Sequence, residues 1–276
     1  SLAKQSIIPF EILVIDNASK DNSKNTVLSF KKTLPIRYIY EAKIGIPFAR
    51  NRALIEAHGE ILAFIDDDCE ASSTWIEEIM KVHMKYPDAT AIQGFTVSKP
   101  FQGLLSILAQ FNRQMWIKDN AIRNYSFQQD KAPNRFNKDF EVLLCDTRNF
   151  SVKIASVRRI HAQFDTYFAR GSDSDFGKQL LSHSEHVIFH PQALVNHYER
   201  QSIFSFLIQI WHQGRTTSKT RKKWPVEYFA VIYRPFTALL LSFVYFCLKR
   251  NYGLKLPLLL PLYILQCISF ELGRLF

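Results

Sequence analysis

Apolar residues in the first hundred positions follow two different spacings. Short, almost continuously apolar runs at 11–15 and 61–65 are typical of strands that are buried on both faces of a sheet. Between them, residues 47–58 repeat apolar positions at helical spacing and stop at Gly59. Strand and helix patterns alternate in this way, so the sequence predicts an α/β fold with a mostly parallel sheet and helices on both faces.

The alternation continues after residue 70. Thr74 and Glu77 match a capping box, which predicts a helix that begins there and ends before Pro87. Residues 118–140 are polar and rich in Asn, which predicts a loop. The other strands expected from the pattern cover 36–41, 90–97, 142–146, 187–190 and 193–197, and the other helices cover 21–32, 101–117 and a short stretch from Val152.

The pattern changes in the last quarter of the chain. Residues 228–248 and 254–270 are strongly apolar, but charged residues and prolines interrupt both segments. A straight membrane span needs about 20 uninterrupted apolar residues, so the segments favour interfacial helices or a shallow hairpin, with a pair of buried core helices as the alternative. The preceding basic run, 215–223, suits an anionic cytoplasmic leaflet. We therefore expect a domain over residues 1–200 and a membrane-associating helical tail over residues 201–276.

Composition narrows the class of partner. The chain has 276 residues and a formal charge of +10, which indicates an anionic partner: nucleic acid, an anionic membrane surface or a phosphorylated substrate. The four cysteines are far apart, which argues against a zinc site or a disulfide framework. The chain opens without a secretory signal pattern, and its first residues read like the end of a helix and a loop. We expect an earlier strand and the true amino terminus to be missing.

Acidic residues follow two of the expected strands. Asp16 ends the first, and Asp66, Asp67 and Asp68 directly follow the run at 61–65. Two carboxylates about 4 Å apart repel by about 4 kcal/mol at the dielectric of a protein surface, so a cleft that holds them favours a bound cation. Ligands of parallel sheets bind outside the carboxyl ends of the strands. This placement favours a functional site over the alternative, a solvated acidic turn.

Four segments occur together in an order and spacing that resemble family 2 glycosyltransferases. They are EILVIDNASKDNS, GIPFARNRALIEAHGEILAFIDDDCE, RNFSVKIASVRRIHAQFDTYFARGSDSDFGKQL and ALVNHYERQSIFSFLIQIWHQGRT, and the resemblance covers about residues 10–218. It implies the GT-A fold, which is Rossmann-like, and inverting transfer from a nucleotide-sugar donor. It also implies that Asp66 and Asp68 form the family's D-x-D motif, with Asp68 as a direct ligand of Mg²⁺ or Mn²⁺, Asp66 nearer the ribose or metal, and Asp67 a neighbour.

The resemblance implies three further roles around the donor and acceptor. Asp16 matches the aspartate that accepts a hydrogen bond from the uracil ring, with an Asx turn or helix cap as the alternative. Arg50 matches a basic position near the base or diphosphate, with a plain surface residue as the alternative. Asp173 matches the catalytic base that takes the acceptor's proton, while Asp175 fits a helix-start residue.

Two residues near the expected tail complete the predicted site. His197 occupies a position where related enzymes place a third metal ligand, although a lone His is usually structural. Arg215 lies in HQGR, which loosely resembles a family motif but lacks its Trp. Arg215 is therefore expected to contact the diphosphate, anionic lipid or neither.

The sequence therefore predicts an inverting, metal-dependent glycosyltransferase. The expected donor is a nucleotide-sugar, chiefly a UDP-sugar, and the expected acceptor is a glycan or lipid-linked molecule at the cytoplasmic membrane face. Two alternatives remain: a nucleotidyltransferase with a similar sheet, or a catalytically inactive membrane-bound scaffold. Nucleic-acid binding is a poorer explanation of the charge, because the basic run adjoins apolar segments and lacks a recognition motif.

Overall fold

The computed structural model describes the chain except residues 101–102, 121–138, 143–144, 200–201, 225–235 and 276. Two compact units divide it: unit 1 comprises Ser1–Thr96 and Leu144–Val195, and unit 2 comprises Val97–Leu143 and Asn196–Phe276. The chain passes between the units three times, at 96–97, 143–144 and 195–196. The expected domain boundary near residue 200 stays a prediction, and most of the expected loop at 118–140 lies outside the described residues.

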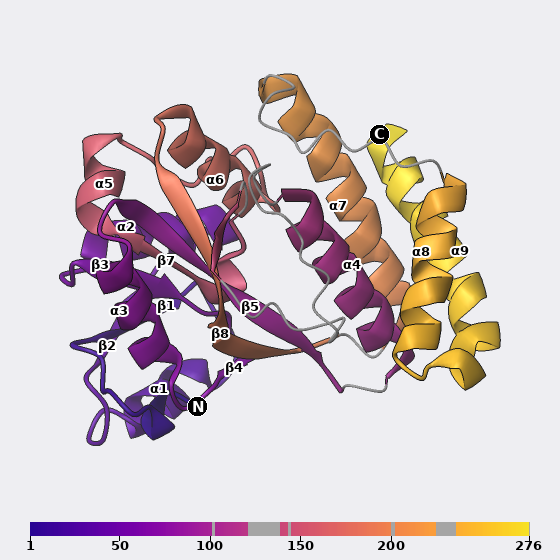
Figure 1. The fold of residues 1–276 in the computed structure, drawn as a ribbon. Coiled ribbons are helices and arrows are strands. Elements are labelled where there is room, and N and C mark those ends of the chain that lie inside the picture. Colours follow the sequence, from indigo (N-terminus) through magenta and orange to yellow (C-terminus); the bar gives the residue numbers. More distant parts are fainter. Residues whose placement is uncertain (101–102, 121–138, 143–144, 200–201, 225–235, 276) are drawn as a thin grey trace. The chain divides into compact units, whose positions relative to one another are not determined.

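Unit 1 begins with a parallel pair of strands, as the sequence predicts. β1 (Ile12–Asp16) pairs with β2 (Ile36–Tyr40) in parallel, and Asp16 lies beside Tyr40 at the carboxyl end of the pair. Helix α1 (Ser23–Ser29) connects them, and α2 (Ile46–Glu56) follows β2 and packs on β1 (Figure 1). The β1–β2 pair therefore places Asp16 at the carboxyl ends of its two strands.

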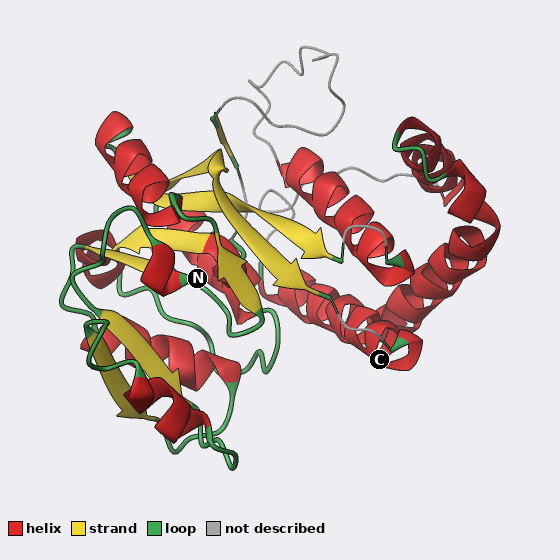
Figure 2. Ribbon diagram, turned by 90° about the horizontal axis from the view of Figure 1, so that it is seen from below, coloured by secondary structure: helices red, strands yellow, loops and turns green. Residues whose placement is uncertain are grey.

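The remaining strands form a larger, mixed sheet. Its order is β3 (Ile61–Phe64), β7 (Phe150–Lys153), β5 (Ala89–Lys99), β8 (His186–Tyr198) and β4 (Cys69–Ala71), and β6 (Phe140–Glu141) pairs with β8. β7 is antiparallel to both β3 and β5. Helices α3 (Trp75–Lys85), α5 (Ile154–Arg159) and α6 (Ser172–Ser182) complete the unit (Figure 1), and Figure 2 shows the strands in yellow. The α/β fold is confirmed, with a mixed sheet.

The segment before β7 differs from the expected strand at 142–146. Only Val142 makes a strand bridge there among the described residues, and a 3₁₀ turn, η2 (Thr147–Asn149), leads into β7. The Asp146 carboxylate accepts a hydrogen bond from the Arg148 N–H, which caps this turn. Local polar bonding therefore replaces the strand that the apolar run suggested.

Two other local predictions need correction. The expected capping box at Thr74 does not form: Thr74 precedes α3 without a side-chain cap bond, and Glu77 instead accepts from Ser6 and pairs with Lys81. The two short strands expected at 187–190 and 193–197 are one continuous strand, β8.

Phenylalanine rings and one buried amide hold the core of unit 1 together. Phe164 stacks on Phe176 with ring centroids 4.4 Å apart, and Phe64 packs edge-on against Phe164. Asn149, which is 1% exposed, accepts from the Trp75 indole N–H at 2.8 Å and donates to the carbonyls of Phe95 and Ala193. This side chain therefore connects α3 to two strands of the sheet.

Unit 2 is mainly helical. Its helices are α4 (Leu104–Asn120), α7 (Ile203–Lys223), α8 (Phe236–Lys249) and α9 (Leu256–Leu275). Phe111, Phe243 and Tyr263 pack together in its core, and α9 lies along α7 and contacts α4 and α8 (Figure 1). Residues 253–275 are long and apolar enough to cross a membrane.

Candidate active site

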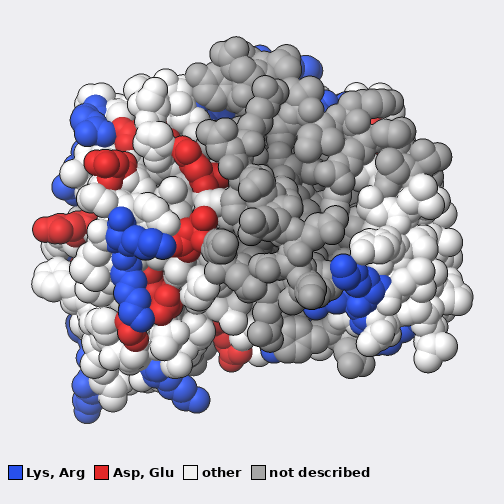
Figure 3. All heavy atoms as spheres, viewed as in Figure 1, with Lys and Arg blue, Asp and Glu red and all other residues white. Residues whose placement is uncertain are grey.

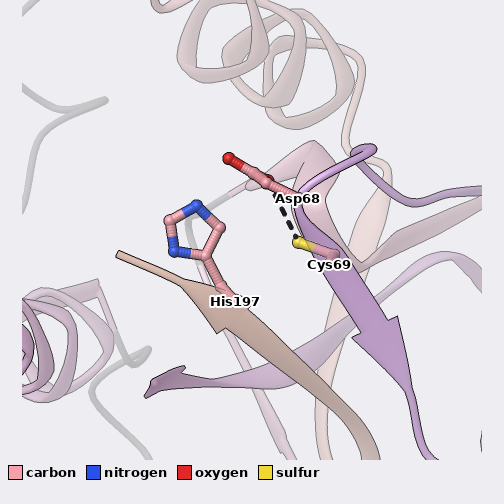
Figure 4. Close-up of side chains that lie close together, drawn as sticks. All are labelled: Asp68, Cys69 and His197. Atoms are coloured by element: carbon pink, nitrogen blue, oxygen red, sulfur yellow. Dashed lines mark hydrogen bonds between the residues drawn. The ribbon is translucent and has the colours of Figure 1, made fainter. Parts of the chain in front are cut away.

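The acidic turn predicted from the sequence lies at the carboxyl end of β3, in unit 1. The Asp66 carbonyl accepts a hydrogen bond from the Cys69 N–H at 3.2 Å, which closes the turn. Asp67 and Asp68 are exposed, and the Cys69 thiol donates to Asp68 Oδ1 at 3.6 Å (Figure 4). The turn therefore presents carboxylate oxygens at the edge of the sheet where a ligand is expected.

Asp66 is the least exposed of the three carboxylates. Its pKa is raised to about 6, chiefly by burial and further by the charges of Asp146 and Asp68, while Arg50 and Arg148 act in the opposite direction. A nearby cation would favour the ionised form and relieve this penalty.

Arg50 joins three elements of unit 1 at this point. Its guanidinium lies 3.9 Å from Asp66 Oδ1 and donates to the Ser172 hydroxyl at 3.4 Å, which links α2, the end of β3 and the start of α6. The same group lies over the Phe164 ring at 5.6 Å. The side chain is only 14% exposed, so Arg50 belongs to the interior edge of the site, not to the open surface.

Asp146 and Arg148 form a second charged pair near Asp66. Arg148 donates to both carboxylate oxygens of Asp146, at 2.8 and 2.6 Å, a bidentate geometry that fixes both side chains. The sequence did not indicate this pair, because the residue that positions Asp146 lies far away along the chain. That residue is Gln93, whose side chain accepts from the Asp146 N–H at 2.7 Å. The one available signal was an Asp at the end of an apolar run.

Asp173, the predicted base, lies in the first turn of α6. Gly171 precedes the helix with φ of 78°, a left-handed conformation that favours glycine, and Ser172 is fully buried. Asp173 Oδ1 accepts from the Ser174 N–H at 2.8 Å, and its side chain is partly exposed. Asp175 is buried and accepts from Gln179 at 2.8 Å. Asp175 thus has the structural, helix-start position that the sequence predicts.

Asp16 has tight local contacts at the end of β1. Its carboxylate accepts from the Tyr38 hydroxyl and from the Ser19 N–H, the latter at 2.8 Å, so the local turn that was the alternative interpretation of Asp16 is present. These bonds, led by that from Tyr38, lower the pKa of Asp16, and the bond to Asp16 raises the pKa of Tyr38 to about 12. Among the described residues of unit 1, no hydrogen bond or ion pair joins Asp16 to Asp66.

His197 and Arg215 belong to unit 2. The His197 ring is buried and contacts Glu199 through Nδ1 at 3.0 Å; Glu199 also receives bonds from Ser98 at 2.7 Å and from Arg113 at 3.3 Å. Burial opposes ionisation of Glu199, but the His197 bond and the Arg113 charge outweigh it and lower its pKa to about 2. Arg215 is exposed and lies over the Trp211 ring at 5.4 Å.

The carboxylates at the end of β3 fit a divalent cation chemically. Mg²⁺ and Mn²⁺ take oxygen ligands and use one or two carboxylates together with substrate phosphates, which Asp66 and Asp68 can supply. Burial is the chief cause of the raised pKa of Asp66, and the charges of Arg50 and Arg148 offset it only in part. On the face of unit 1 in Figure 3, acidic and basic side chains lie interspersed.

Comparison with known sequences gives a consistent picture. Residues 1–146 match the profile described as Glycosyl transferase family 2. A validoxylamine A glucosyltransferase of Streptomyces hygroscopicus subsp. limoneus is 26% identical over 66% of this chain and 44% of its own length. A glucosyl-dolichyl phosphate glucuronosyltransferase of Haloferax volcanii is 22% identical over 75% of this chain and 66% of its own length. The chain thus spans about half to two thirds of these relatives.

Solved structures share the fold. Mannosyltransferase PcManGT from Pyrobaculum calidifontis, in complex with GDP-Man and Mn²⁺, has a TM-score of 0.62 at 15% identity, covering 99% of this chain and 80% of that chain. S. aureus TarS 1–349 in complex with UDP has a TM-score of 0.53 at 15% identity, covering 99% and 84%. At this identity the likeness shows a GT-A-like fold and nothing finer.

Proposed function

Since this chain belongs to glycosyl transferase family 2, we propose that it transfers a sugar from a nucleotide-sugar donor to an acceptor hydroxyl, with inversion. The observation that carries the proposal is the Arg50 contact pair: one guanidinium reaches both Asp66, in the acidic turn, and Ser172, beside the predicted base. Donor-side and acceptor-side candidates are thereby linked within unit 1.

The proposed donor is a UDP-sugar, and Asp16 is the residue proposed to read its base. An ionised carboxylate only accepts hydrogen bonds, so it favours a base that offers a ring N–H and is left unpaired by one that does not. The Tyr38 and Ser19 bonds keep this carboxylate ionised and fixed in direction. The two structural neighbours bind different nucleotides, UDP for TarS and GDP-Man for PcManGT, so base choice is tested separately below.

Asp66 and Asp68 of unit 1 are the proposed ligands of a divalent cation, with Asp67 as a neighbour, and a role of His197 as a third ligand stays a prediction. When bound, the cation neutralises the charge that develops on the leaving diphosphate. Arg50 supplies further positive charge beside Asp66, and the charge of Arg148, which pairs with Asp146, also acts on Asp66. Arg215 is proposed to contact the diphosphate or anionic lipid.

Asp173 is proposed to take the proton from the acceptor hydroxyl as its oxygen attacks the anomeric carbon. Two features support the role: the carboxylate lies in the first turn of α6, directly after the Ser172 that Arg50 contacts, and it remains partly exposed. The proposed acceptor is a glycan or lipid-linked molecule at the cytoplasmic membrane face. Residues 201–276 are proposed as the membrane-associating part.

Transfer assays on single variants test this function. Asp68→Ala and Asp173→Asn are expected to lower kcat/KM for transfer by about 100-fold or more, since each removes a group that acts in the transition state. Asp88→Asn, at an exposed position just after α3, is the matched control and is expected to leave transfer unchanged. Full activity in both site variants would contradict the assignments.

Product analysis separates the alternatives. Release of UDP from a UDP-sugar supports sugar transfer, and pyrophosphate release from a nucleoside triphosphate would indicate a nucleotidyltransferase. Asp16→Asn is expected to reduce discrimination between UDP- and GDP-sugars, which competition for donor binding measures. No heat on calorimetric titration with UDP and Mn²⁺ would indicate an inactive scaffold.

A further inference from the structure

Helix α9 exposes a stripe of large apolar side chains. Leu258, Leu265, Ile268, Leu272 and Leu275 are 62, 46, 51, 47 and 79% exposed, and their three-, four- and seven-residue spacing places them on one side of the helix. We call these five residues the outward face of α9. Such a continuous apolar surface is unusual on a protein that meets only water.

The opposite side of α9 packs against the rest of unit 2 through apolar residues such as Leu259 and Tyr263, with a few polar and small residues among them. Gln266 is 6% exposed and donates to Asn112 of α4 at 2.9 Å, and the Ser269 hydroxyl donates to the Leu207 carbonyl of α7 at 2.8 Å. Gly273 packs against α7 so closely that a Cβ there would lie 2.0 Å from the Trp211 carbonyl oxygen. A helix in water has its polar side outward, whereas α9 is apolar both on the side that packs against unit 2 and on the exposed side.

The charges on and near α9 favour lipid as the partner of the outward face. The helix contains one acidic residue, Glu271, which pairs with Arg274 at 2.9 Å, so the outward face has no net charge of its own. Lys249, Arg250 and Lys255 lie where α8 connects to α9. Basic side chains beside an apolar stripe match an anionic bilayer, whose headgroups attract Lys and Arg and whose acyl chains accept the stripe.

We propose that the outward face of α9 binds the surface of an anionic lipid bilayer, with the helix lying in the interface. This deepens the membrane part of the proposed function and uses only residues of unit 2. At about 1.5 Å per residue the helix is also long enough to span a bilayer. The packing of α9 therefore has to decide between an interfacial helix and a membrane span.

The packing favours the interface. Leu259, Tyr263 and Gln266 are 0, 2 and 6% exposed, so unit 2 covers one side of α9 along the helix. A spanning α9 would either leave these contacts or draw α4 into the hydrocarbon, including the buried Arg113–Glu199 pair. A charged side chain at the bilayer centre costs about 3 kcal/mol on insertion scales. A helix that contacts lipid with one side only has neither cost.

Vesicle binding tests the lipid contact. The full chain is expected to co-sediment with vesicles of phosphatidylcholine containing about a third phosphatidylglycerol, and more weakly with phosphatidylcholine alone. Leu258→Glu with Leu265→Glu is expected to lower the bound fraction at least tenfold. The control, Ile8→Glu with Ile55→Glu, changes two exposed residues of unit 1, 68 and 71% exposed, and is expected to bind like wild type. Equal binding of both double variants, or no wild-type binding, overturns the proposal.

Cysteine labelling distinguishes an interfacial helix from a span. Leu254→Cys and Leu275→Cys, each in a Cys69→Ser, Cys267→Ser background, mark the two ends of the helix. With protein added outside sealed vesicles, a membrane-impermeant maleimide is expected to modify both ends. Modification of one end only shows a span and overturns the interfacial mode. Sugar transfer to a soluble acceptor, measured without vesicles, fails or succeeds independently of these results.

Discussion

Opposing interactions act on the pKa of Asp66. Burial and the neighbouring carboxylates raise its pKa to about 6, while Arg50 and Arg148 lower it. The folded chain therefore binds a proton at Asp66 more readily than the unfolded chain does, and folding stability falls as the pH rises from about 4 through 6. Near neutral pH the ionised side chain costs stability until a cation reaches it.

Asp66→Asn should consequently stabilise the cation-free protein at pH 7.5. A rise of the Asp66 pKa to about 6 would correspond to about 3 kcal/mol in a dry interior, but the side chain is 39% exposed, so screening reduces the expected gain to about 1 kcal/mol. Thermal unfolding at pH 7.5 and pH 4 measures it. The gain should vanish at pH 4, where wild-type Asp66 is protonated, and an equal gain at both pH values would show another cause.

Residue types and positions made part of this environment predictable. Asp66, Asp68 and Arg50 could be selected because an acidic turn after a strand and an Arg on a neighbouring helix are local patterns. The Asp146–Arg148 pair could not, because its placement depends on Gln93, 53 residues away. Asn149 was similarly hidden, since Trp75 and Ala193 are separated from it by 74 and 44 residues.

At the scale of elements, α7 and α9 approach through reciprocal glycines. A Cβ on Gly214 would lie 2.0 Å from the Phe270 carbonyl oxygen, and a Cβ on Gly273 would lie 2.0 Å from that of Trp211. Any side chain at either position would force the two backbones apart. The sequence shows both glycines, but it does not show that they face each other's helix.

Gly273→Ala should therefore destabilise the protein by about 1–3 kcal/mol through overpacking, although Gly→Ala inside an open helix normally stabilises by about 1 kcal/mol. Urea unfolding followed by circular dichroism measures the sign. Gly59→Ala is the control, because its Cβ would meet only the Ile61 carbonyl at 3.5 Å. A stabilised Gly273→Ala protein would refute the close helix contact.

Asn149 has a comparable role among the strands of unit 1. Asn149→Ala would leave the Trp75 N–H and the carbonyls of Phe95 and Ala193 without this partner in a buried setting. The expected loss of stability is about 2–4 kcal/mol, from about 1–3 kcal/mol for each buried group left unpaired and partial relaxation. Chemical denaturation measures it. Asn17→Ala, at a less buried amide in a loop of the same unit, should cost clearly less.

For the whole molecule, the fold class followed from strand and helix periodicity, but the mixed pairing did not. Periodicity identifies strands and leaves their direction open, and β7, which directly follows the η2 turn along the chain, pairs antiparallel with both of its neighbours. The division into two units was also hidden, since segments of each unit alternate along the chain. Contacts between distant segments decide such properties.

Ligand binding gives a prediction at this scale. If UDP and Mn²⁺ bind together, a concentration of about 100 times Kd stabilises the folded chain by about 2.7 kcal/mol, which corresponds to several degrees in Tm. UDP with EDTA should give a much smaller shift, and Asp68→Ala should remove the Mn²⁺-dependent part. Equal shifts with Mn²⁺ and with EDTA would show that nucleotide binding does not require the cation.

The buried contacts of Glu199 restrict how this region can change through mutation. Ser98, Arg113 and His197 all bond to its carboxylate. Replacing Glu199 alone would leave the buried Arg113 guanidinium without this carboxylate, and replacing Arg113 alone would leave the buried carboxylate without this guanidinium. Neither single step is neutral, whereas replacing the charged partners together by apolar residues of similar volume can be. We therefore expect these positions to covary among homologues, and an engineer who alters one should alter its partner in the same step.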